Sequence, residues 1–312
     1  KTNQRLKWLE ERLRSDDESA RLLALRCLWK ALKTREFRSD YNFDFGARKR
    51  DSGWWPTDEE REEWYVKFIG LSVKVVRESL PVAPGIKDIL ARRFRDIWAF
   101  SINIEGVKVG LSSAVRAVLE SGCEDGWKDG WIAIRETIRL DGGKMGEKDR
   151  EVLQELEVLV RPKEVLSLLR IFLFDNHCGM AFSEGDDSSG WDRDTDKMAK
   201  ELCQELAKSE DLLPEAARLM TGDEEGRLLL DADVLGKNLA MHVTSMDRCW
   251  EILLEGFEYR PEYERDSWAL RGYLEGVLER DVELLNRLLD EASRRPSLIR
   301  RVPLFHACML LD

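Results

Sequence analysis

Apolar residues recur at helical spacing along most of the chain. Residues 20–32 show this clearly, because their apolar members stand three or four positions apart, which is the period of a helix with one buried face. Asp16 or Asp17 is expected to cap this helix, since an aspartate before the first turn accepts a backbone hydrogen bond. Thr57, followed three residues later by Glu60, has the spacing of a capping box and predicts another helix start.

The same pattern predicts further helices near residues 86–98, 107–120, 127–140, 147–160, 163–174, 194–208, 212–220, 232–243, 245–256, 264–279, 281–293 and 297–311. Evidence for strands is thin: residues 100–110 alternate weakly, and no second run offers them a partner. We therefore expect an all-α protein of about fourteen helices. Pairs of helices recur roughly every 35–45 residues, which favours an irregular α-solenoid of HEAT-like helical hairpins. A large irregular helical domain is the alternative.

The helical pattern predicts one helical-repeat region over residues 1–312. An acidic stretch rich in serine and glycine, residues 182–196, interrupts it and marks a point of subdivision. The chain starts without Met inside a helical pattern and stops on an apolar segment, whereas natural termini are usually polar and exposed. We therefore expect it to be a piece of a longer protein, or a processed one.

Composition narrows the classes of function. Charged residues make up 36% of the chain, which suits an elongated helical-repeat protein with much surface per residue. A net charge of −11 argues against general binding to nucleic acids or anionic membranes, since both need cationic contacts. No apolar run is long enough to span a membrane. The six scattered cysteines, none in a C-x-x-C motif, indicate reduced thiols and a cytoplasmic protein.

No catalytic motif is complete. Lys144 follows two glycines as in a phosphate-binding loop, but Ile138 occupies the first glycine position and Met145 replaces the hydroxyl residue. The three histidines, His177, His242 and His306, stand apart from any nucleophile motif. We therefore expect neither a cofactor nor enzymatic activity.

The acidic residues at 184–196 raise the question of a metal site. From Asp192 onward the aspartates alternate as in an EF-hand, but Lys197 stands where that loop needs glycine. We interpret the segment as a solvated loop, with Asp194 or Thr195 capping the next helix. The alternative is a metal-dependent enzyme, or a metal-switched domain, that uses this loop.

The candidate binding residues lie in a long loop at residues 36–56. Arg48, Lys49 and Arg50 are followed closely by Trp54 and Trp55. One interpretation is a clasp whose aromatic side chains fold back onto the helical body. The other is a recognition surface, because arginine and tryptophan are favoured at the centres of protein interfaces.

This loop also carries a family resemblance. The motif D-F-G-A-R-x-R-D-x-G-W-W-P, residues 44–56, and the phrase GWKDGWIAIRETIRLDG, residues 126–142, resemble segments of the C-terminal helical regions of large bacterial STAND-type NTPases. The resemblance covers these two blocks and implies a sensor or scaffold region, often in anti-phage defence, with nucleotide chemistry elsewhere in the chain. We therefore expect a non-catalytic protein-binding module. A structural spacer between domains is the second alternative.

Overall fold

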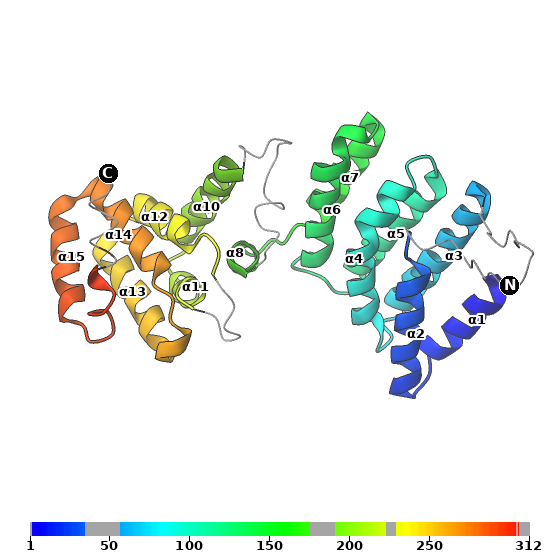
Figure 1. Cartoon of the computed structure of the whole chain (residues 1–312), viewed down its shortest axis with the longest axis horizontal. Coiled ribbons are helices and arrows are strands. Elements are labelled where there is room, and N and C mark those ends of the chain that lie inside the picture. The colour runs from blue at the N-terminus through cyan, green and yellow to red at the C-terminus, as the bar shows by residue number, and fades with distance from the viewer. Residues whose placement is uncertain (1, 35–56, 175–190, 223–228, 304, 306–312) are drawn as a thin grey trace, which may run out of the picture. The chain divides into compact units, whose positions relative to one another are not determined.

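The computed structural model describes residues 2–34, 57–174, 191–222, 229–303 and 305. Within these ranges the chain forms fourteen α-helices and two short 3-10 helices, and it has no β-strand. The all-α prediction is therefore confirmed (Figure 1). The helices group into two compact units, residues 1–162 and 163–312. A continuous HEAT-like solenoid stays a prediction.

Unit 1 contains seven helices among the residues described. They are α1 (Thr2–Leu13), α2 (Glu18–Ala31), α3 (Asp58–Arg77), α4 (Ala83–Phe100), α5 (Glu105–Glu120), α6 (Lys128–Asp141) and α7 (Glu147–Val160). Each helix packs on its second neighbour as well as on its first. Two layers result, with α1, α3, α5 and α7 in one and α2, α4 and α6 in the other (Figure 1).

Unit 2 repeats this arrangement. Its described helices are α8 (Val165–Phe174), α10 (Trp191–Lys208), α11 (Leu213–Met220), α12 (Ala232–His242), α13 (Met246–Tyr259), α14 (Trp268–Arg280) and α15 (Val282–Arg294). Helix α11 packs between α8 and α13, and α12 packs between α10 and α14. Helix α15 covers α14. Stacking on second neighbours is what helical hairpins do in repeat proteins.

The predicted caps are present. Thr57 Oγ1 accepts a hydrogen bond from the Glu60 amide at 3.2 Å, and Glu60 Oε2 accepts one from the Thr57 amide at 3.0 Å. Asp17, rather than Asp16, caps α2 by accepting from the Ser19 amide at 2.9 Å. These bonds satisfy backbone N–H groups that a helix start leaves without partners.

Each unit has a core of buried aromatic residues. Trp98 and Trp131 are the largest fully buried side chains of unit 1, and Trp250 and Tyr273 are those of unit 2. Residues Gly142–Lys144 form a 3-10 turn directly after α6, as expected for a helix ending rather than a phosphate loop.

Four cysteines lie among the described residues, and all of them are free thiols. Cys203 and Cys249 are buried, and burial raises the pKa of both thiols, to about 12 for Cys249. These two are inert core residues, because the thiolate is the reactive form.

Residues 100–110, where the evidence for a strand was thin, contain no extended piece: α4 ends at Phe100, a turn follows, and α5 begins at Glu105. Two local predictions differ from the structure. Residues 191–196 are not loop but the first turns of α10, so Asp194 and Thr195 lie inside the helix and cannot cap it. Residues 297–301 form turns, whereas residues 302, 303 and 305 are helical, so the helix predicted from residue 297 begins later.

Among the described helices, none has both the length and the hydropathy that crossing a membrane requires.

Candidate functional site

The predicted binding residues Arg48, Lys49, Arg50, Trp54 and Trp55 lie outside the residues that the structure describes. The clasp and the recognition surface therefore both stay predictions. The described part of unit 1 contains a different candidate, which the sequence did not single out.

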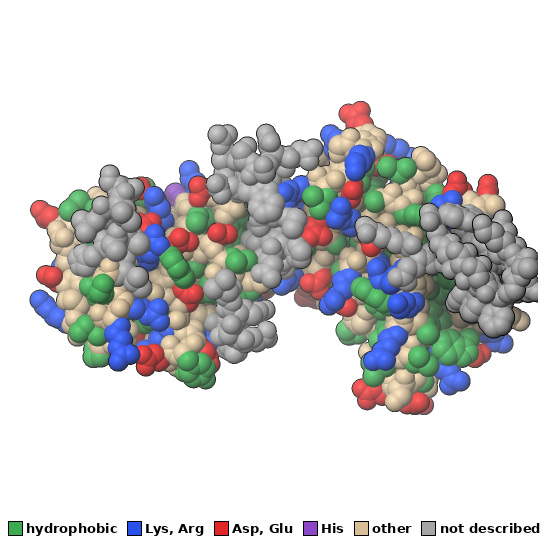
Figure 2. All heavy atoms as spheres, viewed as in Figure 1, with side chains coloured by type: hydrophobic (Ala, Val, Ile, Leu, Met, Phe, Trp, Pro, Cys, Tyr) green, Lys and Arg blue, Asp and Glu red, His purple; other side chains and the backbone are tan. Residues whose placement is uncertain are grey.

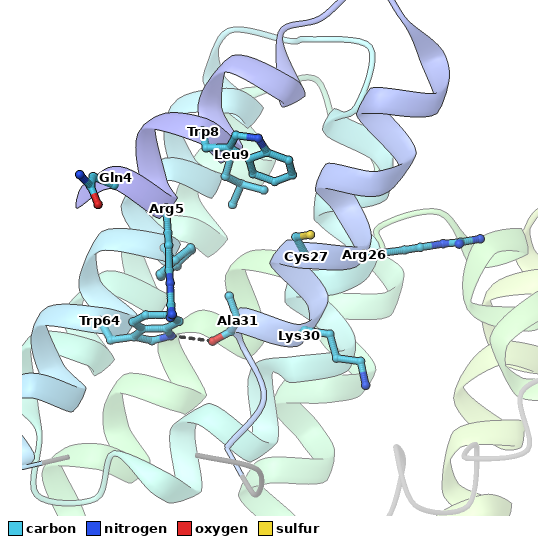
Figure 3. A pocket seen from close by; sticks show the side chains of 10 residues that line it. Gln4, Arg5, Trp8, Leu9, Arg26, Cys27, Lys30, Ala31 and Trp64 are labelled. Atoms are coloured by element: carbon cyan, nitrogen blue, oxygen red, sulfur yellow. Dashed lines mark hydrogen bonds between the residues drawn. The ribbon is translucent and has the colours of Figure 1, made fainter. Parts of the chain in front are cut away.

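This candidate is a groove between α1, α2 and α3 with a cavity volume of about 730 Å³ (Figure 3). Trp8 of α1 and Cys27 of α2 line it from two sides, and Trp64 and Phe68 of α3 contribute a third wall. The volume lies in the range of natural ligand pockets, about 300–1,000 Å³. Three helices thus frame a concave surface large enough for several side chains of a partner.

A hydrogen bond and a ring contact hold the aromatic wall of the groove in place. Trp64 Nε1 donates a hydrogen bond to the Ala31 carbonyl at the end of α2, at 2.8 Å. The rings of Trp64 and Phe68 lie 4.5 Å apart between centroids, tilted by 41°. Because Trp64 is fixed at both its polar and its apolar side, this wall is formed before any ligand arrives.

Three cations surround the groove: Arg5, Arg26 and Lys30. The Arg5 guanidinium carbon lies 5.8 Å from the centroid of the Trp64 ring, and Figure 3 shows this side chain reaching from α1 to that indole. No Asp or Glu is among the described residues that line the groove. Within the described part of the chain no ion pair joins these three cations to a carboxylate.

The groove continues into exposed apolar surface. Trp8 is 39% exposed, and Leu23 of α2 is 50% exposed. Leu23 stands four residues before Cys27 and seven before Lys30, so these three positions share one stripe of α2. Figure 2 shows hydrophobic side chains on the surface over α1 and α2. Leu23 was expected in the buried face of its helix, which Ala24 and Leu28 fill instead.

Polar contacts between α1 and α3 hold the outer wall in position. Lys67 Nζ donates to Asn3 Oδ1 at 2.8 Å, and Lys74 Nζ donates to Glu10 Oε1 at 2.7 Å. The Lys74 hydrogen bond holds the pKa of Glu10 below its usual value, with a further contribution from the positive charges of Lys74 and Arg14. The wall that carries Arg5 and Trp8 is thus anchored at both of its ends.

The described lining of the groove consists mainly of apolar, aromatic and cationic side chains. Its described lining contains no histidine or carboxylate that could act as a base. Among the residues that the structure describes, no three His, Cys, Asp or Glu side chains are grouped to hold a metal ion. His242 lies far along the chain at the end of α12, where burial, Lys200 and Arg280 lower its pKa. His177 and His306 lie outside the described residues.

Sequence reasoning missed this groove for a physical reason. Arg5 and Trp8 read as ordinary members of an amphipathic first helix, and Arg26 and Lys30 as the solvated face of the second. The one available signal was the pair Leu22 and Leu23, which widens the apolar face of α2 beyond what one layer of neighbours can cover.

Comparison of the chain with protein-family models, with curated proteins and with solved structures gives no match.

Proposed function

We propose that the chain is a non-catalytic protein-binding module, a sensor or scaffold, whose partner docks in the groove between α1, α2 and α3. One observation carries the proposal: the groove combines an exposed Trp8 and a preformed aromatic wall with three cations that no described carboxylate neutralises. This occurs in a chain whose net charge is −11. Aromatic residues and arginine are the residue types that most often anchor protein interfaces.

The chemistry of the groove selects its partner. An amphipathic helix can lay its apolar face into such a groove, with anchors at positions i, i+3 or i+4, and i+7. Asp and Glu beside those anchors would meet Arg5, Arg26 and Lys30. Because Arg26 and Lys30 are exposed, their charges act chiefly on the association rate and its salt dependence.

The wider role follows from the resemblance and the helix stacking. The resemblance of residues 44–56 and 126–142 to STAND-type helical regions supports a place in a larger bacterial protein of the cytoplasm, in anti-phage defence. The second-neighbour stacking in each unit supports HEAT-like repeats, which present long surfaces to protein partners. A structural spacer would need no groove with exposed aromatic and cationic residues.

The test is a selection of helical peptides from a random display library on the full chain. We expect enriched peptides to carry Leu, Phe or Trp at helical spacing and an excess of Asp and Glu beside them. Trp8→Ala should weaken the selected peptides about tenfold or more, as truncation of an interface anchor does. The double variant R26A/K30A should reduce both their association rate and the salt dependence of that rate.

The chain offers a matched control for Trp8. Trp268 of α14 is also an exposed tryptophan, at 47%, and it also lies near a guanidinium, with Arg271 at 5.0 Å from its ring centroid. Trp268→Ala should leave peptide binding unchanged. Enrichment of basic peptides, no enrichment at all, or an equal loss in both variants would each contradict the proposed groove.

A further inference from the structure

Unit 2 contains a second cavity, of about 640 Å³, whose lining is rich in arginine. Arg265 follows the 3-10 turn Glu262–Glu264, and Arg294, Arg300 and Arg301 come from the end of α15 and the turns after it. Phe257 of α13 contributes an apolar wall, and Glu262 is the one carboxylate among the described lining residues. The lining thus carries four positive charges and one negative charge in an acidic chain.

Two of these arginines are fixed before any ligand arrives. Arg265 donates from Nε to the Arg260 carbonyl at 2.7 Å and from a terminal nitrogen to the Glu258 carbonyl at 3.2 Å. Arg301 donates to Ser267 Oγ at 3.0 Å and to the Arg265 carbonyl at 3.4 Å. Their guanidinium carbons lie 5.4 and 5.6 Å from the centroid of the Phe257 ring. Each guanidinium has about five N–H donors in all, so most of them stay available to a ligand.

The other two arginines, Arg294 and Arg300, form no ion pair with a described carboxylate. Their neighbour Arg295 shows the contrast, because it is paired with Glu291 at 2.7 Å and with Glu258 at 3.5 Å. Among the described residues, none of the four arginines around this cavity is joined to a carboxylate by an ion pair, in a chain whose net charge is −11.

We propose that this cavity binds a small anion that carries two or more phosphate groups. Guanidinium groups match phosphate oxygens with paired N–H donors, and their planar fork keeps that geometry specific. A single phosphate carries about two negative charges, fewer than the three by which the lining is positive. A diphosphate or triphosphate supplies the missing charge. The acidic remainder of the chain repels a long nucleic-acid backbone, which favours a small ligand.

Calorimetric titration of the full chain at low, constant ionic strength tests this site. The probes are inorganic phosphate, pyrophosphate, tripolyphosphate and ATP, with a short single-stranded oligonucleotide as the rival. We expect pyrophosphate and tripolyphosphate to bind at least about tenfold more tightly than phosphate, because more arginines engage at once. If ATP binds much more tightly than tripolyphosphate, the natural ligand is a nucleotide. Equal affinities would identify the phosphate chain alone.

The variants separate the site from general charge. Arg294 and Arg300 are both exposed, so replacing either with Ala should leave the fold intact. Each of the two variants should bind tripolyphosphate about tenfold more weakly, which corresponds to about 1.4 kcal/mol. Arg287→Ala removes the same charge from α15, where Arg287 pairs with Asp247 at 2.8 Å, and should change the affinity less than about twofold. The proposal is overturned by absent binding of every phosphate probe at millimolar concentration, by an equal loss in the Arg287 variant, or by an oligonucleotide that binds more tightly than tripolyphosphate.

Discussion

Gly272 of α14 lies directly against the backbone carbonyl of Asp233 in α12, so closely that a β-carbon on Gly272 would overlap the carbonyl oxygen. Two other glycines repeat this relationship along the same pair of helices. A β-carbon on Gly236 would meet the Ala269 carbonyl, and one on Gly276 would lie 2.5 Å from the Lys237 carbonyl. Helices α12 and α14 therefore approach backbone to backbone, and this contact is the tightest helix pairing of unit 2.

Gly272→Ala should destabilise unit 2 by about 1–3 kcal/mol or more, because the new methyl group has only backbone to displace. Gly70 provides the matched control: it lies inside α3, and nothing stands within 4 Å of a β-carbon placed there. Gly70→Ala should stabilise the protein by about 0.4–1 kcal/mol through its higher helix propensity. Thermal unfolding of both variants tests whether the two changes in stability have opposite signs. A stabilising Gly272→Ala would show that the helices do not approach as described.

Asp149→Ala should be costly, because it strips the partner from a nearly buried ammonium group. Lys108 Nζ lies 2.7 Å from Asp149 Oδ2 and donates to the Ile102 carbonyl at 2.8 Å, and the Lys108 side chain is only 8% exposed. Removing one partner of a buried ion pair lowers the free energy of unfolding by about 3–5 kcal/mol.

The neighbouring ion pair between Lys148 and Glu105 serves as the control, because both side chains are exposed. Removing it should lower the free energy of unfolding by no more than about 1 kcal/mol. Denaturant unfolding compares Asp149→Ala with Lys148→Ala, both of which act on α7. Similar small losses in the two variants would place Lys108 in solvent and contradict the buried pair.

Trp131 should show a graded response to substitution. Its fully buried indole donates from Nε1 to Glu157 Oε1 at 2.6 Å, and Arg135 donates to the same oxygen at 3.2 Å. Trp131→Phe removes a hydrogen bond to a charged group and should cost about 1.5–3 kcal/mol. Trp131→Ala also opens a cavity and should cost about 3–5 kcal/mol. Equal unfolding midpoints for the Phe variant and the unmodified chain would rule out a stabilising role for the bond to Glu157.

Acid should loosen the outer wall of the groove. The pKa of Glu10 is lower in the folded chain than in the unfolded chain, chiefly because of the hydrogen bond from Lys74. Glu10 therefore stabilises the fold above its unfolded-state pKa, and this stabilisation is lost as the pH falls through its folded-state pKa. Hydrogen exchange of the α1 amides should therefore accelerate between neutral pH and about pH 3, after correction for the intrinsic rate. In Glu10→Gln the protection should be lower at neutral pH and should change less with acid. An identical profile in both proteins would remove Glu10 from the anchoring of α1.

The sequence by itself determined the class of fold and most helix positions. The 3.6-residue period, the capping box at Thr57 and Glu60, and the cap at Asp17 are local signals, because their hydrogen bonds form within one turn of the chain. Their outcome does not depend on distant residues. Residues 191–196 were misjudged because their polar composition resembles a loop, while acidic side chains also suit a helix start.

Only the tertiary structure decided which helices pair and where cavities form. Gly236 and Gly272 look like weak points of two helices in the sequence, and they become contact points only when α12 and α14 cross. Arg5, Trp8 and Trp64 are unremarkable members of separate helices until α1 and α3 meet at one groove. Arg265 and Arg301 stand 36 residues apart, yet both flank the ring of Phe257. Sequence patterns record period and propensity, whereas a site depends on contacts between residues far apart in the chain, and packing alone sets those contacts.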